Sequence, residues 1–364
     1  MENKGALESN TDELYEAIAK AARVEGTIRF YDGWTGGRLA ICRSLYDFFL
    51  KKTGVEIDWY TSGPAQTPPL VWNEDYSGEL RFDVMHTSDV AGVWYPLKER
   101  RRLMAYVPPE AVALRKGTSD PDGYFHFSSG TAHVPMYNPD RLTPSELPKS
   151  FKELVQPRWK NRLAIPDPNS MEPVRYLLAW MYAKYGPEYI VALAGQNPKV
   201  PLEGRAAVEL VTKEEVDVLV ETGAPRCVEA RKKGEPIAYF VMEEGAFYKE
   251  GYVGINAQTK KPNLSKLFVR WLLSLEAQKI IVDGDFDPAR TDITTPDWYF
   301  PFAKYEQEGK LLGDKSPYWV DIQQRYRHIA VKTYLDALRD TDLRIFRFQK
   351  LVDRVPGKVH GDGY

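Results

Sequence analysis

The sequence predicts an α/β protein made of parallel βαβ units, and three observations indicate this class. Short runs of β-branched and aromatic residues alternate along the chain with stretches whose apolar residues recur at helical spacing. Glycine and hydroxyl residues mark the turns between these segments. The length of 364 residues corresponds to two domains of roughly 150 residues each. Such alternation is typical of parallel strands joined by crossover helices.

The N-terminal third of the chain follows this alternation closely. We expect strands over residues 27–31, 55–60 and 82–85. We expect amphipathic helices over residues 11–24 and 39–52, and a further helix from residue 89 toward Leu97. Residues 63–80 begin with proline and glycine and show no clear period, so we expect an irregular surface segment there.

The rest of the chain repeats the same pattern with longer helices. Helices are expected over residues 148–160, 172–185, 221–233 and 263–282, and over most of the tail from residue 291. Extended segments are expected over residues 163–165, 215–220, 237–242 and 253–255. The apolar run 131–138 is predicted to cross between the two domains.

Composition narrows the class of function. Lys and Arg total 49 and Asp and Glu total 51, giving a net charge of −2, which argues against a nucleic-acid partner held by counterion release. The chain contains 9 Trp, 22 Tyr and 15 Phe, a richness common in proteins that hold small organic molecules or sugars. Cys42 and Cys227 show no metal-binding spacing, and we expect two buried thiols, although a disulfide between them is an alternative.

The chain shows no segment for membrane insertion. No window approaches the roughly 18 apolar residues of a membrane span. Residues 1–5 lack the basic start and apolar stretch of a secretory signal. A mature secreted chain would look the same, so this terminus leaves the location open.

Four strand-to-helix junctions form the predicted ligand site. Ligands of parallel α/β sheets bind beyond the carboxyl ends of the strands, where helix N-termini offer unpaired N–H groups to an anion. The junction residues predicted to bind ligand are Trp34, Thr35 and Gly36, then Thr87 and Ser88, then Asn169 and Ser170, and finally Thr222 and Gly223. The alternative for each junction is that its hydroxyl merely caps the helix.

Three further side chains are predicted to contact the ligand. Arg226 and Arg175 follow two of these junctions, and a guanidinium matches the oxygens of a carboxylate, phosphonate or sulfonate. A solvated helix arginine is the alternative for both. Tyr31, like Trp34, is placed to stack on an apolar or cationic part of a ligand. Trp94, at helical spacing, is expected in the core, and His86 is more simply a satisfied loop histidine.

Enzyme motifs are missing from the sequence. There is no GxSxG, HExxH, GxxxxGK[ST] or post-strand GxGxxG, and the five histidines share no ligand spacing. We therefore expect no catalytic residues, no resident metal and no cofactor.

Several phrases resemble a known family. The start of the first unit, residues 22–31, the segment 148–154 and above all the run 157–168 resemble extracytoplasmic solute-binding proteins of ABC importers, in the ferric-iron branch. The resemblance covers most of residues 20–280. It implies a type II periplasmic-binding-protein fold, with two α/β lobes, a ligand cleft between them and a hinge of crossing segments near residues 128–134 and 239–245.

The resemblance also implies how the chain is divided and where it works. Lobe one would comprise residues 1–130 plus 243–290, and lobe two residues 131–242 plus 291–364 with its C-terminal helices. A monomer in the periplasm or another extracytoplasmic compartment, its signal peptide absent from the given sequence, would meet an ABC permease transiently. Neither nucleic acid nor direct membrane insertion is implied.

The expected ligand follows from where the chain departs from the iron binders. Their adjacent tyrosine pair is missing, and residues 223–226 read Gly-Ala-Pro-Arg instead. We therefore expect capture of a small organic anion, a carboxylate, phosphonate or sulfonate, with a flat apolar part on Trp34. Ferric iron, a cationic solute such as thiamine or a polyamine, an enzyme on the same scaffold, and a sensor for a receptor remain alternatives.

Overall fold

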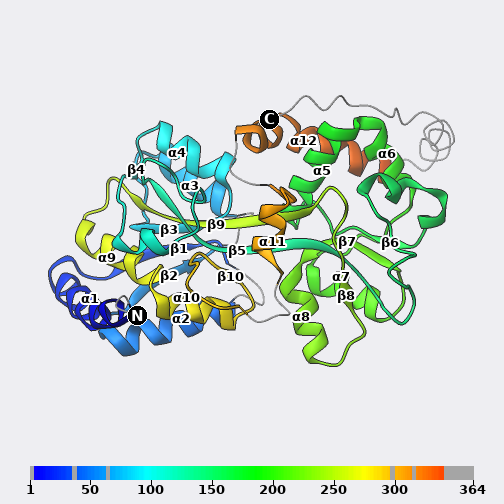
Figure 1. The fold of residues 1–364 in the computed structure, drawn as a ribbon. Coiled ribbons are helices and arrows are strands. Elements are labelled where there is room, and N and C mark those ends of the chain that lie inside the picture. The colour runs from blue at the N-terminus through cyan, green and yellow to red at the C-terminus, as the bar shows by residue number, and fades with distance from the viewer. Residues whose placement is uncertain (1–3, 35–38, 63–65, 296–299, 314–316, 340–364) are drawn as a thin grey trace. The chain divides into compact units, whose positions relative to one another are not determined.

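Helices and strands alternate in both of the units into which the chain divides (Figure 1). The computed structural model describes residues 4–34, 39–62, 66–295, 300–313 and 317–339. Unit 1 comprises Met1–Thr131 and Tyr248–Phe302, and unit 2 comprises Ala132–Phe247 and Ala303–Tyr364. The chain therefore passes between the units within two long strands, β5 (Phe125–Tyr137) and β9 (Ala246–Asn256), and again after Phe302.

The sheet of unit 1 has a parallel centre. Strand β1 (Ile28–Asp32) pairs in parallel with β2 (Ile57–Thr61) on one side and with β3 (Val84–Thr87) on the other. The unit 1 part of β9 pairs antiparallel with β3. Figure 1 shows α2 (Leu39–Thr53), α9 (Pro262–Leu272) and α10 (Leu275–Asp283) below this sheet, and α3 (Thr67–Tyr76) and α4 (Tyr95–Glu99) above it. The parallel βαβ units predicted from the alternation are confirmed.

Aromatic side chains fill the core of unit 1. Phe30 from β1 packs against Phe268 from α9, with ring centroids 4.9 Å apart, and Phe49 from α2 packs against Trp271 at 4.6 Å. All four rings are 2% exposed or less. Their burial is the main favourable contribution to holding these helices on the sheet, because each large ring removes much apolar area from water.

One segment of unit 1 differs from the prediction. Within the expected irregular segment 63–80, Thr67–Tyr76 is a helix with proline in its first turn. Its buried face carries the carboxylate of Glu74, which accepts hydrogen bonds from Tyr31 Oη at 2.6 Å and from the backbone N–H of Arg81 at 2.9 Å. A buried carboxylate breaks the apolar period, so the hydrophobic pattern did not reveal this helix. Residues 63–65 lie outside the described part of the chain.

Unit 2 has its own sheet and helical cover. The unit 2 part of β5 pairs antiparallel with β7 (Val218–Gly223), which pairs in parallel with β6 (Leu163–Ala164). Helix α12 (Pro317–Arg339) packs on α5 (Glu172–Tyr185) and α6 (Pro187–Gly195), where Trp319 stacks on Trp180 at 6.4 Å. The remaining elements are α1 (Lys4–Glu25), α7 (Gly204–Thr212), α8 (Ala224–Lys232), α11 (Phe302–Gln307), β4 (Leu103–Met104), β8 (Ala238–Tyr239), β10 (Asp287–Pro288) and β11 (Leu311–Leu312).

Two predicted helices are wrong in form. Residues 148–160 fold as two short 3₁₀ turns, Phe151–Val155 and Pro157–Trp159, rather than as a capped helix. The side chain of Ser150 makes no capping bond, and Pro157, which lacks an N–H, stops a helix from continuing. The expected helix 263–282 is interrupted between α9 and α10, where Ser274 accepts from the N–H of Ala277 at 3.3 Å.

Replacing Ser274 with alanine is expected to lower the free energy of unfolding by about 1 kcal/mol, because the first turn of α10 then loses its side-chain cap. Urea unfolding followed by circular dichroism measures the change. Ser274→Asp is the control and should retain most of the stability. Equal stability of the alanine variant and the parent would show that this cap contributes nothing.

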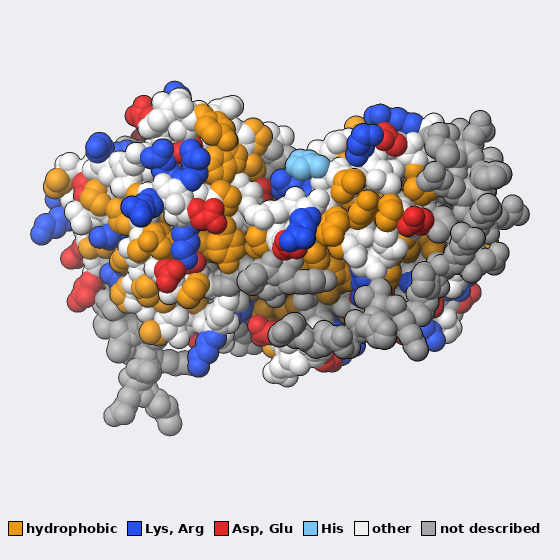
Figure 2. All heavy atoms as spheres, turned by 90° about the horizontal axis from the view of Figure 1, so that it is seen from above, with side chains coloured by type: hydrophobic (Ala, Val, Ile, Leu, Met, Phe, Trp, Pro, Cys, Tyr) orange, Lys and Arg blue, Asp and Glu red, His pale blue; other side chains and the backbone are white. Residues whose placement is uncertain are grey.

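Both cysteines are buried free thiols, as expected. Burial raises the pKa of Cys227 to about 11. None of the helices in the described part of the chain is long and apolar enough to span a membrane. Figure 2 shows basic and acidic side chains interspersed over the surface of unit 1 that faces the viewer.

Candidate functional site

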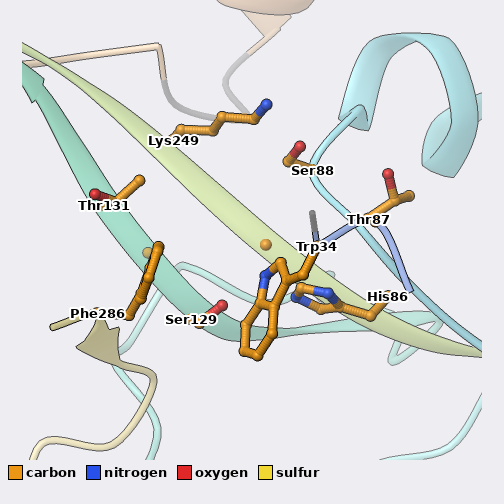
Figure 3. Close-up of a pocket in the computed structure, with 11 residues that line it drawn as sticks. Trp34, His86, Thr87, Ser88, Ser129, Thr131, Lys249 and Phe286 are labelled. Carbon is orange, nitrogen blue, oxygen red and sulfur yellow. The ribbon is translucent and has the colours of Figure 1, made fainter. Parts of the chain in front are cut away.

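A pocket lies in unit 1 where β1 and β3 end (Figure 3). It encloses about 330 Å³, including its open mouth. Its walls also draw on the unit 1 parts of β5 and β9 and on the segment before β10. The described residues that line it are Gly33, Trp34, His86, Thr87, Ser88, Ser129, Gly130, Thr131, Lys249, Gly251 and Phe286.

An aromatic wall forms one side of this pocket. The indole of Trp34 stacks on Phe286 with ring centroids 6.0 Å apart and meets the imidazole of His86 edge-on at 4.8 Å. The turn after β1 holds Trp34 in place, because its backbone N–H donates to Asp32 Oδ1 at 3.0 Å. A flat apolar group of a ligand could pack against this wall.

Polar groups line the rest of the pocket. Thr87 and Ser88 follow β3, Ser129 and Thr131 come from β5, and Lys249 comes from β9. Thr87 Oγ1 is buried and has no hydrogen-bond partner among the described atoms. Lys249 is only 7% exposed, and a lysine ammonium offers N–H donors that suit the oxygens of an anion.

Buried side chains outside the pocket support its wall. Trp94, fully buried in the π-helical turn Val90–Trp94, donates from Nε1 to the carbonyl of Thr87 at 2.9 Å. Asp89 accepts from the N–H of Gly92 at 2.8 Å and so caps this turn. The core position expected for Trp94 is confirmed. The cap of this turn is the carboxylate of Asp89 and not the hydroxyl of Thr87 or Ser88.

Asp32 and His86 form a buried pair behind the aromatic wall. The His86 Nδ1 atom lies 3.0 Å from Asp32 Oδ1, and the two side chains are 4% and 1% exposed. His86 is therefore part of the pocket wall and not a simple loop histidine. The sequence pointed to it only through its position at the end of β3.

Of the predicted site residues in unit 1, three line this pocket: Trp34, Thr87 and Ser88. Tyr31 does not, because its hydroxyl donates to Glu74 in the core. Burial, together with this bond, raises the pKa of Tyr31. Thr35 and Gly36 lie outside the described residues.

The junction before α5 is a polar turn at the surface of unit 2. Asp167 accepts from Ser170 Oγ at 3.0 Å and from the backbone N–H of Asn169 at 3.1 Å. Met171, not Asn169 or Ser170, occupies the N-cap position of α5. Arg175 lies half-buried in the first turns of that helix, and its Nε has no partner among the described atoms.

The junction before α8 differs from its prediction. The strand expected over residues 215–220 is Val218–Gly223, so Thr222 lies within β7 and Gly223 takes the N-cap position of α8. Thr222 Oγ1 is buried without a partner among the described atoms. Beside it, Glu221 is hydrogen-bonded to His133 Nδ1 of β5, and both are buried.

Arg226 is on α8 in unit 2. It lines a surface groove between α7 and α8 whose other charged residues are Arg205, Glu209, Glu229, Lys233 and Glu235. Its guanidinium covers Gly204, where an added Cβ would clash with Arg226 Nε. Its role as an anion contact stays a prediction, as do those of Arg175, Asn169, Ser170, Thr222 and Gly223.

Six residues of the pocket wall are not among the residues predicted from the sequence. Ser129, Gly130, Thr131, Lys249, Gly251 and Phe286 come from β5, from β9 and from the residue before β10. None of them follows a parallel strand, so the rule used to choose junction residues could not select them. Within the described ranges, no three His, Cys, Asp or Glu side chains are grouped so that they could hold a metal ion.

Comparison with known proteins defines the class. Residues 96–307 match the family described as "Bacterial extracellular solute-binding protein". This match spans more than half of the chain, which therefore belongs to that family. The structure is similar to iron-bound HitA from Pseudomonas aeruginosa, with a TM-score of 0.71 at 18% identity over 85% of this chain and 99% of that one. The type II periplasmic-binding-protein fold implied by the resemblance is confirmed.

Two relatives with similar sequences are named for different solutes. The thiamine-binding periplasmic protein of Salmonella typhimurium is 29% identical over 186 residues, which is 50% of this chain and 54% of that protein. The Fe(3+)-binding periplasmic protein of Serratia marcescens is 23% identical over 250 residues, 66% of this chain and 72% of that protein. The chain thus spans about half the length of the thiamine-binding relative.

Proposed function

We propose that this protein is the extracytoplasmic solute-binding component of an ABC importer. It captures a small organic anion, a carboxylate, phosphonate or sulfonate, and delivers it to a membrane permease without chemical turnover. Membership of the solute-binding family supports the capture role. Binding by closure of two lobes about a hinge stays a prediction.

The kinds of side chain that line the pocket are the observation that supports an anionic ligand. Of the eleven described residues in its wall, one is a lysine, Lys249, and none is Asp or Glu. Thr87, Ser88, Ser129 and Thr131 add hydroxyl donors, which suit the oxygens of an anion. The wall of Trp34 and Phe286 supports a flat apolar part next to the anionic group.

A thiamine-like cation is the second candidate. The aromatic wall favours it, because indole and phenyl faces attract flat cationic rings. The sequence similarity to a thiamine-binding protein adds support. Lys249 opposes it, since two positive charges in a poorly hydrated pocket repel each other.

Thermal unfolding against a panel of carboxylates, phosphonates, sulfonates, thiamine, polyamines and ferric ion tests this function. A true ligand at 1,000 times its dissociation constant should stabilise the protein by about 4 kcal/mol. We expect the largest shift with an organic anion. Lys249→Met should reduce that shift, whereas Lys304→Met, at an exposed position on α11, should leave it unchanged. A shift with thiamine or ferric ion alone would overturn the anionic assignment.

A further inference from the structure

We propose that His86 contacts the bound solute through Nε2 as a hydrogen-bond acceptor, and that Asp32 is the positioning residue that fixes its tautomer. The site then selects anions that also carry a donor, a hydroxyl or an N–H group. This inference rests on the proposed function and deepens it, because it names a chemical requirement of the solute.

Asp32, at the end of β1, has hydrogen-bond partners on both of its carboxylate oxygens. It is 1% exposed and accepts hydrogen bonds on both oxygens. Oδ1 accepts from the N–H of Trp34 at 3.0 Å and pairs with His86 Nδ1, and Oδ2 accepts from Trp59 Nε1 at 3.1 Å and Cys42 Sγ at 3.2 Å. Partners on both sides fix the plane of the carboxylate, so that it can orient an imidazole.

The contact with Asp32 determines which ring nitrogen of His86 carries the proton. A carboxylate accepts, so Nδ1 must donate to it. In the neutral imidazole the other nitrogen, Nε2, then presents a lone pair. His86 is 3% exposed, and Nε2 is buried with no hydrogen-bond partner among the described atoms. A buried acceptor in this state favours a solute that brings a donor to it.

His86 Nε2 lies close to Gly251, a residue of the pocket wall. A Cβ at residue 251 would lie 2.6 Å from His86 Nε2 and 3.1 Å from Ser129 Oγ. Gly251 and Ser129 both line the pocket, as does His86 itself. Trp34 holds the imidazole from another side with its edge-on contact (Figure 3). The unpartnered acceptor is therefore next to the hydroxyl-lined space where the solute is expected.

Nitrogen-15 NMR of the ligand-free protein, labelled at histidine, tests the positioning role of Asp32. His86→Gln identifies the His86 signals. In the parent protein at neutral pH, Nε2 should give the signal of an unprotonated nitrogen and Nδ1 that of a protonated one. Asp32→Asn should shift His86 toward the opposite tautomer while the exposed His328 signals stay in place. A protonated Nε2 in the parent, or an unchanged tautomer in folded Asp32→Asn, would overturn the proposal.

Matched solutes test the donor requirement without relying on the Asp32 variant. Thermal shifts are compared for glycolate and methoxyacetate, for mandelate and α-methoxyphenylacetate, and for hydroxymethylphosphonate and methoxymethylphosphonate. In the pair that binds, the hydroxyl compound should bind about tenfold more tightly, because its methyl ether leaves Nε2 unpaired. His86→Phe should abolish this preference.

The outcomes separate this inference from the proposed function. Equal binding of a hydroxyl compound and its ether, or a preference that survives in His86→Phe, overturns the donor requirement and leaves anion capture standing. No binding of any organic anion, here and in the wider panel, overturns the anionic function and the donor requirement with it.

Discussion

Replacing Trp94 with alanine is expected to lower the free energy of unfolding by about 4 kcal/mol, the usual scale for deleting a buried tryptophan. The side chain is fully buried in unit 1 and packs on Phe125, with ring centroids 5.4 Å apart. It also fits against Gly254 of β9, where an added Cβ would lie 2.6 Å from the Trp94 ring. A neighbourhood shaped this closely to the indole cannot collapse easily into the cavity.

The same substitution should also loosen the pocket. Trp94 Nε1 holds the carbonyl of Thr87, a residue of the pocket wall, so its loss leaves that carbonyl buried without its donor. Trp94→Phe is the control, since it keeps most of the ring and loses the hydrogen bond, and it should cost clearly less than the alanine variant. Urea unfolding measures both. An alanine variant within about 1 kcal/mol of the parent would contradict the role given to Trp94.

Asp287 is expected to make the stability of the protein depend on pH. Its carboxyl group is 4% exposed in β10, where Asp287 pairs with Gly130 of β5. Burial raises the pKa of Asp287 to about 7, and the charge of Arg115 offsets part of this effect. The ordinary value of 3.8 applies in the unfolded chain. The folded protein therefore keeps this proton over a range in which the unfolded chain has lost it.

The sign of the effect follows from this difference. The stability contributed by the retained proton is fully present below about pH 4 and is lost as the pH rises through about 7. At about 1.4 kcal/mol per pKa unit, the loss is at most roughly 4 kcal/mol. Asp287→Asn should remove this part of the pH dependence. The free energy of unfolding of the variant minus that of the parent should therefore be larger at pH 8 than at pH 4.

Urea unfolding at a series of pH values checks this prediction. The matched control is Asp336→Asn, because Asp336 is 52% exposed in a surface ion pair with Lys332 and should leave the pH profile unchanged. A parent and an Asp287→Asn variant with parallel profiles between pH 4 and 8 would contradict the assignment of the shifted group.

Much of the architecture could be predicted from the sequence because it depends on local periodicity. The strand at Ile28, the helix from Leu39 and the helix from Glu172 each show their pattern within a dozen or so residues. The predictions failed where a buried polar group interrupts the pattern. Glu74 on α3 is such a position, since its buried carboxylate accepts from Tyr31, a residue of β1, and from the N–H of Arg81. Ser274 interrupts the expected helix 263–282 in another way, by capping α10 through the nearby N–H of Ala277.

The pocket residues likewise fall into those that the sequence could predict and those that it could not. Trp34, Thr87 and Ser88 could be identified from the sequence because they follow parallel strands, and chain order alone brings the ends of such strands together. The residues on the other side of the pocket could not be identified from the sequence. Ser129, Lys249 and Gly251 come from long strands that enter the pocket from distant parts of the chain.

What the sequence by itself determined is the α/β class, the order of most elements and three members of the pocket, because these depend on residues close together in the chain. Only the tertiary structure decided that Asp32 meets His86, 54 positions away, and that Gly251 leaves room for the imidazole. Side-chain orientation and the pairing of buried polar groups depend on contacts between distant segments, and no local pattern encodes them.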